Sequence, residues 1–231
     1  MAANVSPRHI SLIETGKSNP SSDMILRLAA QLDVPLRDRN QLLLAGGFAP
    51  RYSERSLQSD APSMVGEAIT RVLRAHEPYP ALVIDRGWNL VMTNRAVEPF
   101  LAGAAADLLR PPVNLVRLAL HPRGLASRLV NLADVRANLR GRIMRQLATS
   151  REPELTRLYE ELLGPDTAET PSLGRESELV LSMIFRLDDR RELRLFSTTT
   201  KFGSALDVTL DELSIELYHP ADDESAAYFA G

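Results

Sequence analysis

Apolar side chains in the first fifty residues recur at the spacing of short amphipathic helices. The first such helix is predicted over residues 6–14, where Ser6 followed by Pro7 is typical of a helix start. Serine caps the first turn, and proline fits the first helical position because that position needs no intrahelical N–H bond. The same spacing predicts a second helix over 23–32 and a third over 36–45, which ends at two glycines.

Beyond residue 63 the pattern changes between helical and strand periods. Two apolar runs flank a short Asp-Arg-Gly turn and predict a β-hairpin, and strict alternation returns near the C-terminus. The predicted elements are helix 64–75, strands 81–84 and 88–93, helical segments 94–101, 114–121 and 125–132, a long helix from 134, helix 154–163, and strands 179–187, 193–202 and 213–217. A loop is expected over 166–177. About five antiparallel strands with helices on one face predict an α+β fold.

Composition limits the class of protein. The chain has 231 residues, which suits one large domain or two small ones, and 44% of them are hydrophobic. It contains no cysteine, so disulfides, thiolate metal sites and a cysteine nucleophile are excluded. No apolar run approaches the ~18 residues of a membrane span, and the N-terminus lacks the apolar region of a signal peptide. We therefore expect a cytoplasmic protein without membrane contact.

Charge divides the chain at a polar stretch, Ser53–Pro62, where the apolar periodicity stops. Residues 1–56 carry a net charge of +2 and the remainder carries −5. A mildly basic head on an acidic body fits binding to a polyanion, although so small an imbalance arises by chance about as often. We expect a head over 1–56, a linker over 57–63 and a second domain over 64–231.

The head resembles a known DNA-binding family. Residues 5–50 (VSPRHISLIETGKSNPSSDMILRLAAQLDVPLRDRNQLLLAGGFAP) resemble the second half of an Xre-family helix-turn-helix domain, above all in the run I-x-x-I-E-x-G-K-x-x-P. The resemblance implies that the first helix enters the major groove of operator DNA, where Arg8 would pair with a guanine. Lys17 and Asn19, with Ser6, would hold phosphates. The implied DNA-binding residues are Ser6, Pro7, Arg8, His9, Leu12, Lys17 and Asn19.

The head also departs from this family. An Xre domain begins with one further helix and a complete second helix, of which only residues 2–4 are represented here. Either the native start lies upstream or the chain is a truncated relative, and we expect weak DNA binding by the chain alone. Two alternatives stay open. The segment can be a short capped helix with an exposed arginine, and the protein can be a ligand-binding or protein-interaction module that has lost DNA binding.

The second domain resembles the ligand-binding domain of MmyB-like regulators, which has a PAS-like fold. The matching stretches are YPALVIDRGWNLVMTNRA at 79–96, NLVRLALHPRGL at 114–125 and FSTTTKFGSALDVTLDELSIELYHPADD at 196–223. The resemblance implies an apolar cavity for a small hydrophobic ligand such as a fatty acyl chain. An arginine or the hydroxyls of Thr198, Thr199 and Thr200 would bind a ligand carboxylate. The candidate lining residues are Tyr79, Leu82, Trp88, Met92, Phe100, Leu118, Met183, Phe185 and Phe202. Taken singly, each of them fits a core position better than a pocket, and only the set as a whole indicates a cavity.

Signs of catalysis are missing from the sequence. The four histidines are far apart, and no nucleophile elbow or phosphate-binding glycine loop occurs. His121-Pro122 and His219-Pro220 are interpreted as turns, and 207–212 as an extended piece that caps a turn. We expect no enzyme activity, metal or cofactor. The leading interpretation is a transcriptional regulator, a homodimer that binds double-stranded operator DNA and a small apolar effector.

Overall fold

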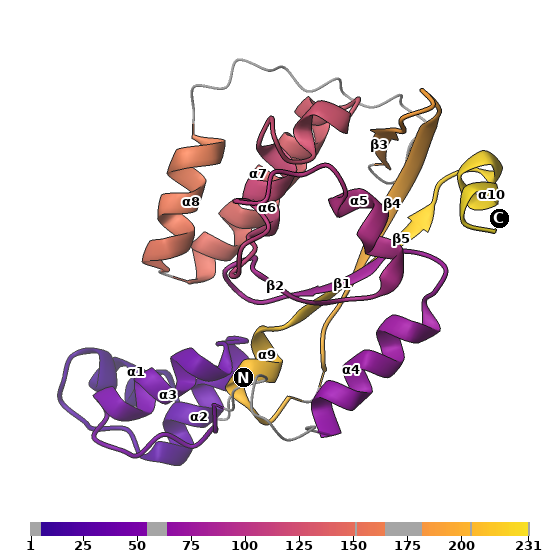
Figure 1. Cartoon of the computed structure of the whole chain (residues 1–231). Helices are drawn as coiled ribbons and strands as arrows, with labels where there is room; N and C mark the ends of the chain where they lie inside the picture. The colour runs from indigo at the N-terminus through magenta and orange to yellow at the C-terminus, as the bar shows by residue number, and fades with distance from the viewer. Residues whose placement is uncertain (1–5, 55–63, 151, 165–181, 204, 231) are drawn as a thin grey trace. The chain divides into compact units, whose positions relative to one another are not determined.

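The computed structural model describes residues 6–54, 64–150, 152–164, 182–203 and 205–230 (Figure 1). The chain forms two compact units. The first contains residues 1–63 together with 201–213, and the second contains 64–200 and 214–231. The first unit therefore includes a late segment of the chain, which the predicted boundary at 57–63 assigns to the second domain.

Three helices of the first unit lie where the sequence predicts them. They are α1 (Pro7–Glu14), α2 (Ser22–Gln31) and α3 (Leu36–Ala45). The side chain of Ser6 accepts the N–H of His9 at 3.2 Å, so the predicted serine cap of α1 is confirmed. Helices α2 and α3 pack together, and the buried apolar residues in the described part of this unit are Ala29, Leu36, Leu43, Val208 and Leu213.

A fourth helix of the first unit comes from the late segment. Residues Val208–Glu212 form the short helix α9, so the prediction of an extended piece is wrong. The carboxylate of Asp207 accepts the N–H groups of Thr209 and Leu210 at 3.0 and 3.4 Å. An aspartate in the N-cap position satisfies these donors and so favours a helical turn over an extended strand.

The second unit is built on one antiparallel sheet. Its strands are β1 (Ala81–Ile84), β2 (Leu90–Thr93), β3 (Ser182–Arg186), β4 (Glu192–Thr200) and β5 (Ser214–Pro220). Their order across the sheet is β2-β1-β5-β4-β3, so the last strand of the chain pairs with the first. The predicted α+β fold, with a five-stranded antiparallel sheet after a helical N-terminal segment, is confirmed.

Helices of the second unit supply the other half of its core. They are α4 (Met64–Ala75), α5 (Glu98–Leu101), α6 (Leu115–Leu120), α7 (Leu132–Thr149), α8 (Pro153–Leu163) and α10 (Asp223–Ala230), with the 3₁₀ turns η1 (Arg95–Val97) and η2 (Ala126–Arg128). Helices α6, α7 and α8 contact one another and form one group in Figure 1. Their apolar faces share a buried cluster with β1, β3 and β4. The sequence did not predict α10, and the expected loop at 166–177 and residues 179–181 lie outside the described residues.

Candidate functional site

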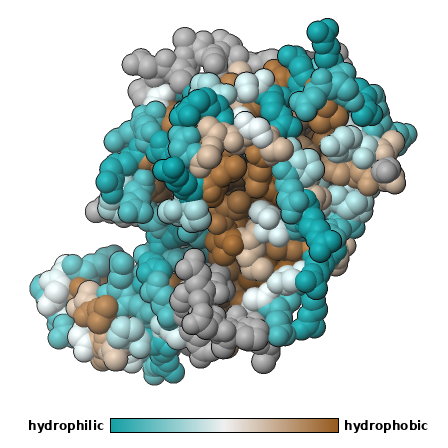
Figure 2. Space-filling view, viewed as in Figure 1, coloured by the Kyte–Doolittle hydropathy of each residue, from teal (hydrophilic) through white to brown (hydrophobic). Residues whose placement is uncertain are grey.

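An apolar cavity lies between the sheet of the second unit and its helices. Its volume is about 180 Å³, and Figure 2 shows apolar residues gathered around a hollow in the visible face. The lining residues are Pro80, Leu82, Trp88, Leu90, Val97, Phe100, Leu101, Leu115, Leu118, Ala119, Leu125, Leu129, Val135, Asn138, Leu139, Arg142, Met183, Phe185, Leu195, Ser197 and Tyr218. A concave, mostly apolar site with few polar groups is typical of small-molecule binding.

Six of the nine predicted lining residues lie on this cavity, namely Leu82, Trp88, Phe100, Leu118, Met183 and Phe185. They come from four separate parts of the chain, which the sheet and helices bring together. The rings of Phe100 and Phe185 meet edge to face at 5.1 Å between centroids, a favourable aromatic geometry. Whether these residues bind a ligand stays a prediction.

The other three predicted residues do not line the cavity. Tyr79 packs its ring against Phe229, with the centroids 5.5 Å apart. Phe202 lies beyond the end of β4, in the late segment that belongs to the first unit. Met92 lies on the opposite face of the hairpin from the cavity, because an irregularity in the strand pairing reverses the direction of its side chain.

A β-bulge shifts the pairing register between β1 and β2 by one residue. Val83 pairs with Met92, but its neighbour Ile84 pairs with Leu90, so one extra residue of β2 is left between these pairs. Side chains alternate along a regular strand, and a single extra residue inverts that alternation. Leu90 therefore lines the cavity while Met92, two residues later, does not.

Helix α7 contributes four lining residues that are absent from the predicted set. Val135, Asn138, Leu139 and Arg142 lie along one face of this helix and line the cavity. Their spacing of three or four residues is the helical period. The apolar stripe that the sequence shows at Val135 and Leu139 reaches Arg142 one turn later, so the periodicity could have identified this residue.

Arg142, which lines the cavity, forms an ion pair with the buried residue Glu216. The guanidinium of Arg142 contacts both carboxylate oxygens of Glu216, at 3.4 Å for one and closer for the other, and Glu216 is only 1% exposed. The hydroxyl of Thr199 donates to the same carboxylate at 3.0 Å. The guanidinium also lies 4.7 Å from the ring centroid of Trp88, within the range of a cation–π contact. Glu216 therefore balances the charge of Arg142.

The remaining polar groups of the cavity are uncharged. Burial, with the nearby carboxylate of Glu216, raises the pKa of the Tyr218 phenol, so it is neutral at physiological pH. Asn138 and Ser197 add an amide and a hydroxyl. Thr198, Thr199 and Thr200, predicted as carboxylate ligands, are exposed and do not line the cavity. Of the described lining residues only Arg142 carries a charge, which makes it the one cation for an anionic ligand.

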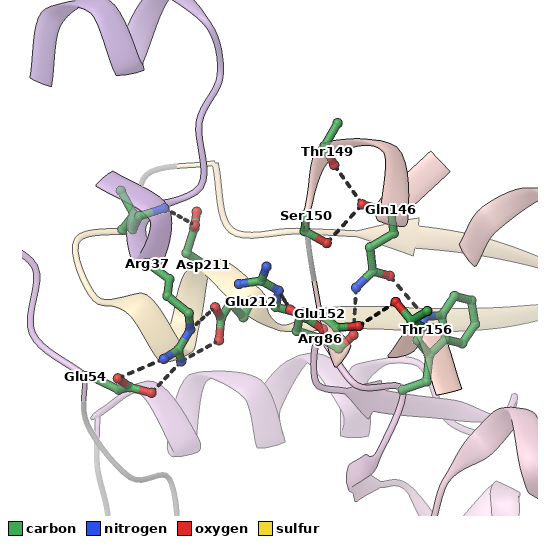
Figure 3. A network of polar contacts seen from close by, with 12 residues as sticks. Arg37, Glu54, Arg86, Gln146, Thr149, Ser150, Glu152, Thr156, Asp211 and Glu212 are labelled. Carbon is green, nitrogen blue, oxygen red and sulfur yellow. Dashed lines mark hydrogen bonds and ion pairs between the residues drawn. The ribbon is translucent and has the colours of Figure 1, made fainter. Parts of the chain in front are cut away.

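Trp88 is fixed in position by backbone geometry and by hydrogen bonds. Its φ is +65°, a left-handed conformation that a bulky residue rarely adopts and that a tight turn imposes here. The indole N–H donates to the side-chain oxygen of Gln146 at 3.1 Å, and the Gln146 amide donates to the backbone oxygen of Arg86 at 2.7 Å. Arg86 is ion-paired with Glu152 (Figure 3). The aromatic wall of the cavity is therefore tied to both α7 and the turn before β2.

The predicted DNA-binding residues all lie in α1 and the loop after it. Ser6, Pro7, Arg8, Lys17 and Asn19 are exposed, and His9 and Leu12 are partly exposed. Gly16 adopts a φ of +68° and ends the helix, and the next N–H, from residue 17, bonds back to the carbonyl of residue 12 at 2.8 Å. Helix α1 buries none of its residues. The exposure suits contacts with DNA, and the contacts themselves stay a prediction.

The histidines have structural surroundings. His121 accepts the N–H of Arg123 at 3.0 Å, so the predicted local hydrogen bond is confirmed. His219 lies in β5, so its assignment to a turn is wrong. Its ring meets that of His76 at 4.9 Å, and burial together with this neighbour lowers the pKa of His219. Among the described residues, no three potential ligands of the His, Cys, Asp and Glu types gather as a metal site would require.

Comparison with protein families identifies the two parts of the chain. Residues 65–230 match the MmyB-like transcription regulator ligand binding domain. The chain belongs to the MmyB-like transcription regulator family. Residues 1–38 of this MmyB-like regulator match a helix-turn-helix family, which confirms the predicted order of a DNA-binding segment followed by a ligand-binding domain. No curated protein matches the chain. Within the described residues, no helix of the regulator is long and apolar enough to span a membrane.

Proposed function

We propose that this MmyB-like regulator binds operator DNA through α1 and the following loop, as a homodimer in the cytoplasm, and that an apolar ligand in the cavity controls this binding. The observation that carries the proposal is the cavity itself, because its lining is mostly apolar and Arg142 is the one charged residue among the described lining residues. A molecule with a hydrocarbon chain and one polar end matches that distribution. Operator DNA as the target follows from the match to a helix-turn-helix family.

A fatty acid is the ligand that we propose first. Its chain would lie against the aromatic and leucine side chains, and its carboxylate would accept hydrogen bonds from Arg142. Because Glu216 already uses part of this guanidinium, the ligand carboxylate would share the cation with it. The uncharged donors Asn138, Ser197 and Tyr218 are close at hand to supplement the contact.

Ligand binding can be followed with the protein's own fluorescence, because Trp88 is the single tryptophan of the chain and lines the cavity. Titration with saturated fatty acids of increasing length is expected to change its emission in a saturable manner. Ala119→Phe, which adds a ring to the cavity lining, should abolish the response, whereas Ala105→Phe, at a position outside the lining, should preserve it. An unchanged titration in Ala119→Phe contradicts the cavity as the binding site.

DNA binding is tested with a duplex that the full chain selects from a random pool. Titrations with this duplex, with and without a saturating C16 fatty acid, should differ because a ligand that prefers one state shifts the equilibrium between states. Identical curves would contradict control by the ligand. No selection of any sequence above background would contradict DNA binding itself.

The second candidate function is a ligand-binding module without DNA binding. The observation that favours it is that α1 buries none of its residues, and that Ile10 and Ile13 are only partly covered. A helix of eight residues without packing contributes little order of its own. The two candidates separate on one comparison, since the module would bind the fatty acid normally and bind the selected duplex no better than scrambled DNA.

A further inference from the structure

The segment that connects β4 to β5 contacts α3 in the first unit. Residues 201–213 leave the sheet after Thr200 and re-enter it at Ser214, and in between they pack as part of the first unit. Here they are called the β4–β5 segment, of which residues 201–203 and 205–213 are described. The chain therefore passes from the ligand-binding sheet into the first unit and back within thirteen residues.

The β4–β5 segment supplies a cap that α3 lacks. Pro35 stands at the N-cap position of α3 and offers no side-chain oxygen. The N–H of Leu36, the first residue of the helix, donates instead to the carboxylate of Asp211 at 3.0 Å. A carboxylate at this place also interacts favourably with the positive end of the helix dipole. The start of α3 is thus completed by a residue from the other end of the chain.

Arg37 makes a second contact between α3 and the segment. Its guanidinium donates to both oxygens of Glu212, at 2.6 and 3.0 Å, and also to the carboxylate of Glu54 (Figure 3). Hydrogen bonds to Glu212 and then to Glu54 raise the pKa of Arg37. The geometry is bidentate toward each carboxylate, which orients the three side chains as well as attracting them.

Backbone contacts complete the connection. The N–H of Val208 donates to the carbonyl of Ser53 at 2.8 Å, and the Ser53 hydroxyl donates to Asp207 at 2.9 Å. The residues just before Ser53 are in turn bonded to α3. The side-chain oxygen of Asn40 in this helix accepts the N–H groups of Arg51 and Tyr52. Val208 is 1% exposed, so the segment is packed into the first unit as well as hydrogen-bonded to it.

The two strands that the segment joins are linked to each other beside Arg142, a lining residue of the cavity. Arg142 lines the cavity and bonds to Thr199 of β4 and Glu216 of β5. These two residues face each other in the sheet, and only the pair Thr200–Ile215 separates them from the segment. A ligand carboxylate that takes hydrogen bonds from Arg142 would compete with the bonds of Arg142 to Thr199 and Glu216, one residue pair before the segment leaves the sheet.

We propose that the β4–β5 segment transmits the ligand state of the cavity to the first unit, by strengthening or releasing the contacts of Asp211 and Glu212 with the start of α3. The inference rests on the proposed function, because it requires a ligand in the cavity. It requires that the start of α3 exist in two states, capped and uncapped, whose equilibrium a ligand shifts through chain connectivity. Arg37, Asp211 and Glu212 act here as positioning residues.

Hydrogen exchange of the full chain tests this inference directly. A C16 fatty acid is added to saturation, as judged by Trp88 fluorescence, and amide exchange is compared with the ligand-free protein. We expect the exchange rates in residues 33–40 and 205–213 to change by at least about threefold, since both include amides of the proposed element. In the variant Asp211→Asn/Glu212→Gln, the ligand should bind equally well but the response at 33–40 should disappear.

Two further variants serve as a charge-matched control and as a second way to break the ion pair. Asp188→Asn/Glu160→Gln removes two exposed carboxylates elsewhere, makes the same change in net charge, and should respond like the unmodified protein. Arg37→Gln breaks the ion pair from the side of α3 and leaves α9 unchanged, so it serves if the Asp211 variant does not fold. Its response at 33–40 should also be lost.

The outcomes separate the inference from the proposed function. An unchanged exchange pattern at 33–40 in the ligand-saturated, unmodified chain overturns the inference while leaving ligand binding established. The inference is also overturned if amide exchange at residues 33–40 responds to the ligand in Arg37→Gln, or in Asp211→Asn/Glu212→Gln, as strongly as in the unmodified protein. A Trp88 signal that no fatty acid changes contradicts the proposed function, and the inference falls with it.

Discussion

Replacing Arg142 by methionine should destabilise the protein more than any loss of a surface charge. Glu216 would keep the hydroxyl of Thr199 but lose its counter-ion while remaining 1% exposed. Breaking a buried ion pair from one side costs about 3–5 kcal/mol because the other charge is left unpaired. The Arg142 side chain is 25% exposed, so water can reach the site and the lower end, about 3 kcal/mol, is expected. Loss of the contact with Trp88 adds roughly 0.5–1 kcal/mol.

Urea unfolding followed by circular dichroism measures this cost. Arg117→Met is the matched control, because its partner Glu161 is about half exposed and such surface pairs contribute at most about 1 kcal/mol. Arg142→Met/Glu216→Met removes both charges and should recover most of the loss, since apolar pairs of similar volume replace buried ion pairs well. If Arg142→Met costs no more than Arg117→Met, the carboxylate is not buried in solution as described and the reasoning is refuted.

Three more predictions concern other parts of the chain. A Cβ at Gly124 would lie 2.2 Å from the backbone oxygen of Leu118, so Gly124→Ala should lower the free energy of unfolding by about 1–3 kcal/mol or more. A melting temperature within about 1 °C of the unmodified protein would contradict this close contact. Arg8→Ala should weaken binding to the selected duplex about 5- to 150-fold if Arg8 pairs with guanine. Lys17→Ala should weaken binding to all duplexes alike and reduce the slope of log affinity against log salt concentration by about 0.9. Equal losses on all sequences for both variants would refute the base contact. Burial and a neighbouring histidine lower the pKa of His219, so the folded state favours the neutral imidazole. The stability that depends on this neutral form is present above pH 6.5 and is lost as the pH falls below it. Urea titrations from about pH 7.5 to about pH 5.5 should show a smaller loss in His219→Asn, and parallel losses would refute this.

Local signals in the sequence were sufficient for most of the helices and strands. The serine caps, the helix-ending glycines and the alternation of the strands depend on neighbouring residues, so α1, α2 and α3 and the hairpin could be predicted closely. The cavity itself was expected from the resemblance to MmyB-like ligand-binding domains. Trp88 and Phe185 were among the expected lining residues because large apolar groups favour buried positions, whereas most of the leucines that line the cavity were not expected.

Features that depend on distant contacts could not be predicted in this way. The prediction that Met92 lines the cavity is wrong, because the bulge in the hairpin inverts the alternation of side chains between Leu90 and Met92. The pair of Arg142 and Glu216 joins residues 74 positions apart, and nothing near either of them in sequence marks the partner. The extended prediction for 207–212 failed for a related reason, since α9 is stabilised by packing into a unit formed mostly by the N-terminal residues.

The cap on α3 also has a consequence for synthesis of the chain. The N–H of Leu36 and the carboxylate of Asp211 are 175 residues apart, so the ribosome makes almost the whole ligand-binding domain before the start of α3 can be completed. Domains generally begin to fold as they emerge, N-terminal first. In this protein the start of α3 gains its carboxylate cap only after Asp211 has been synthesised, later than strands β1 to β4 of the ligand-binding domain.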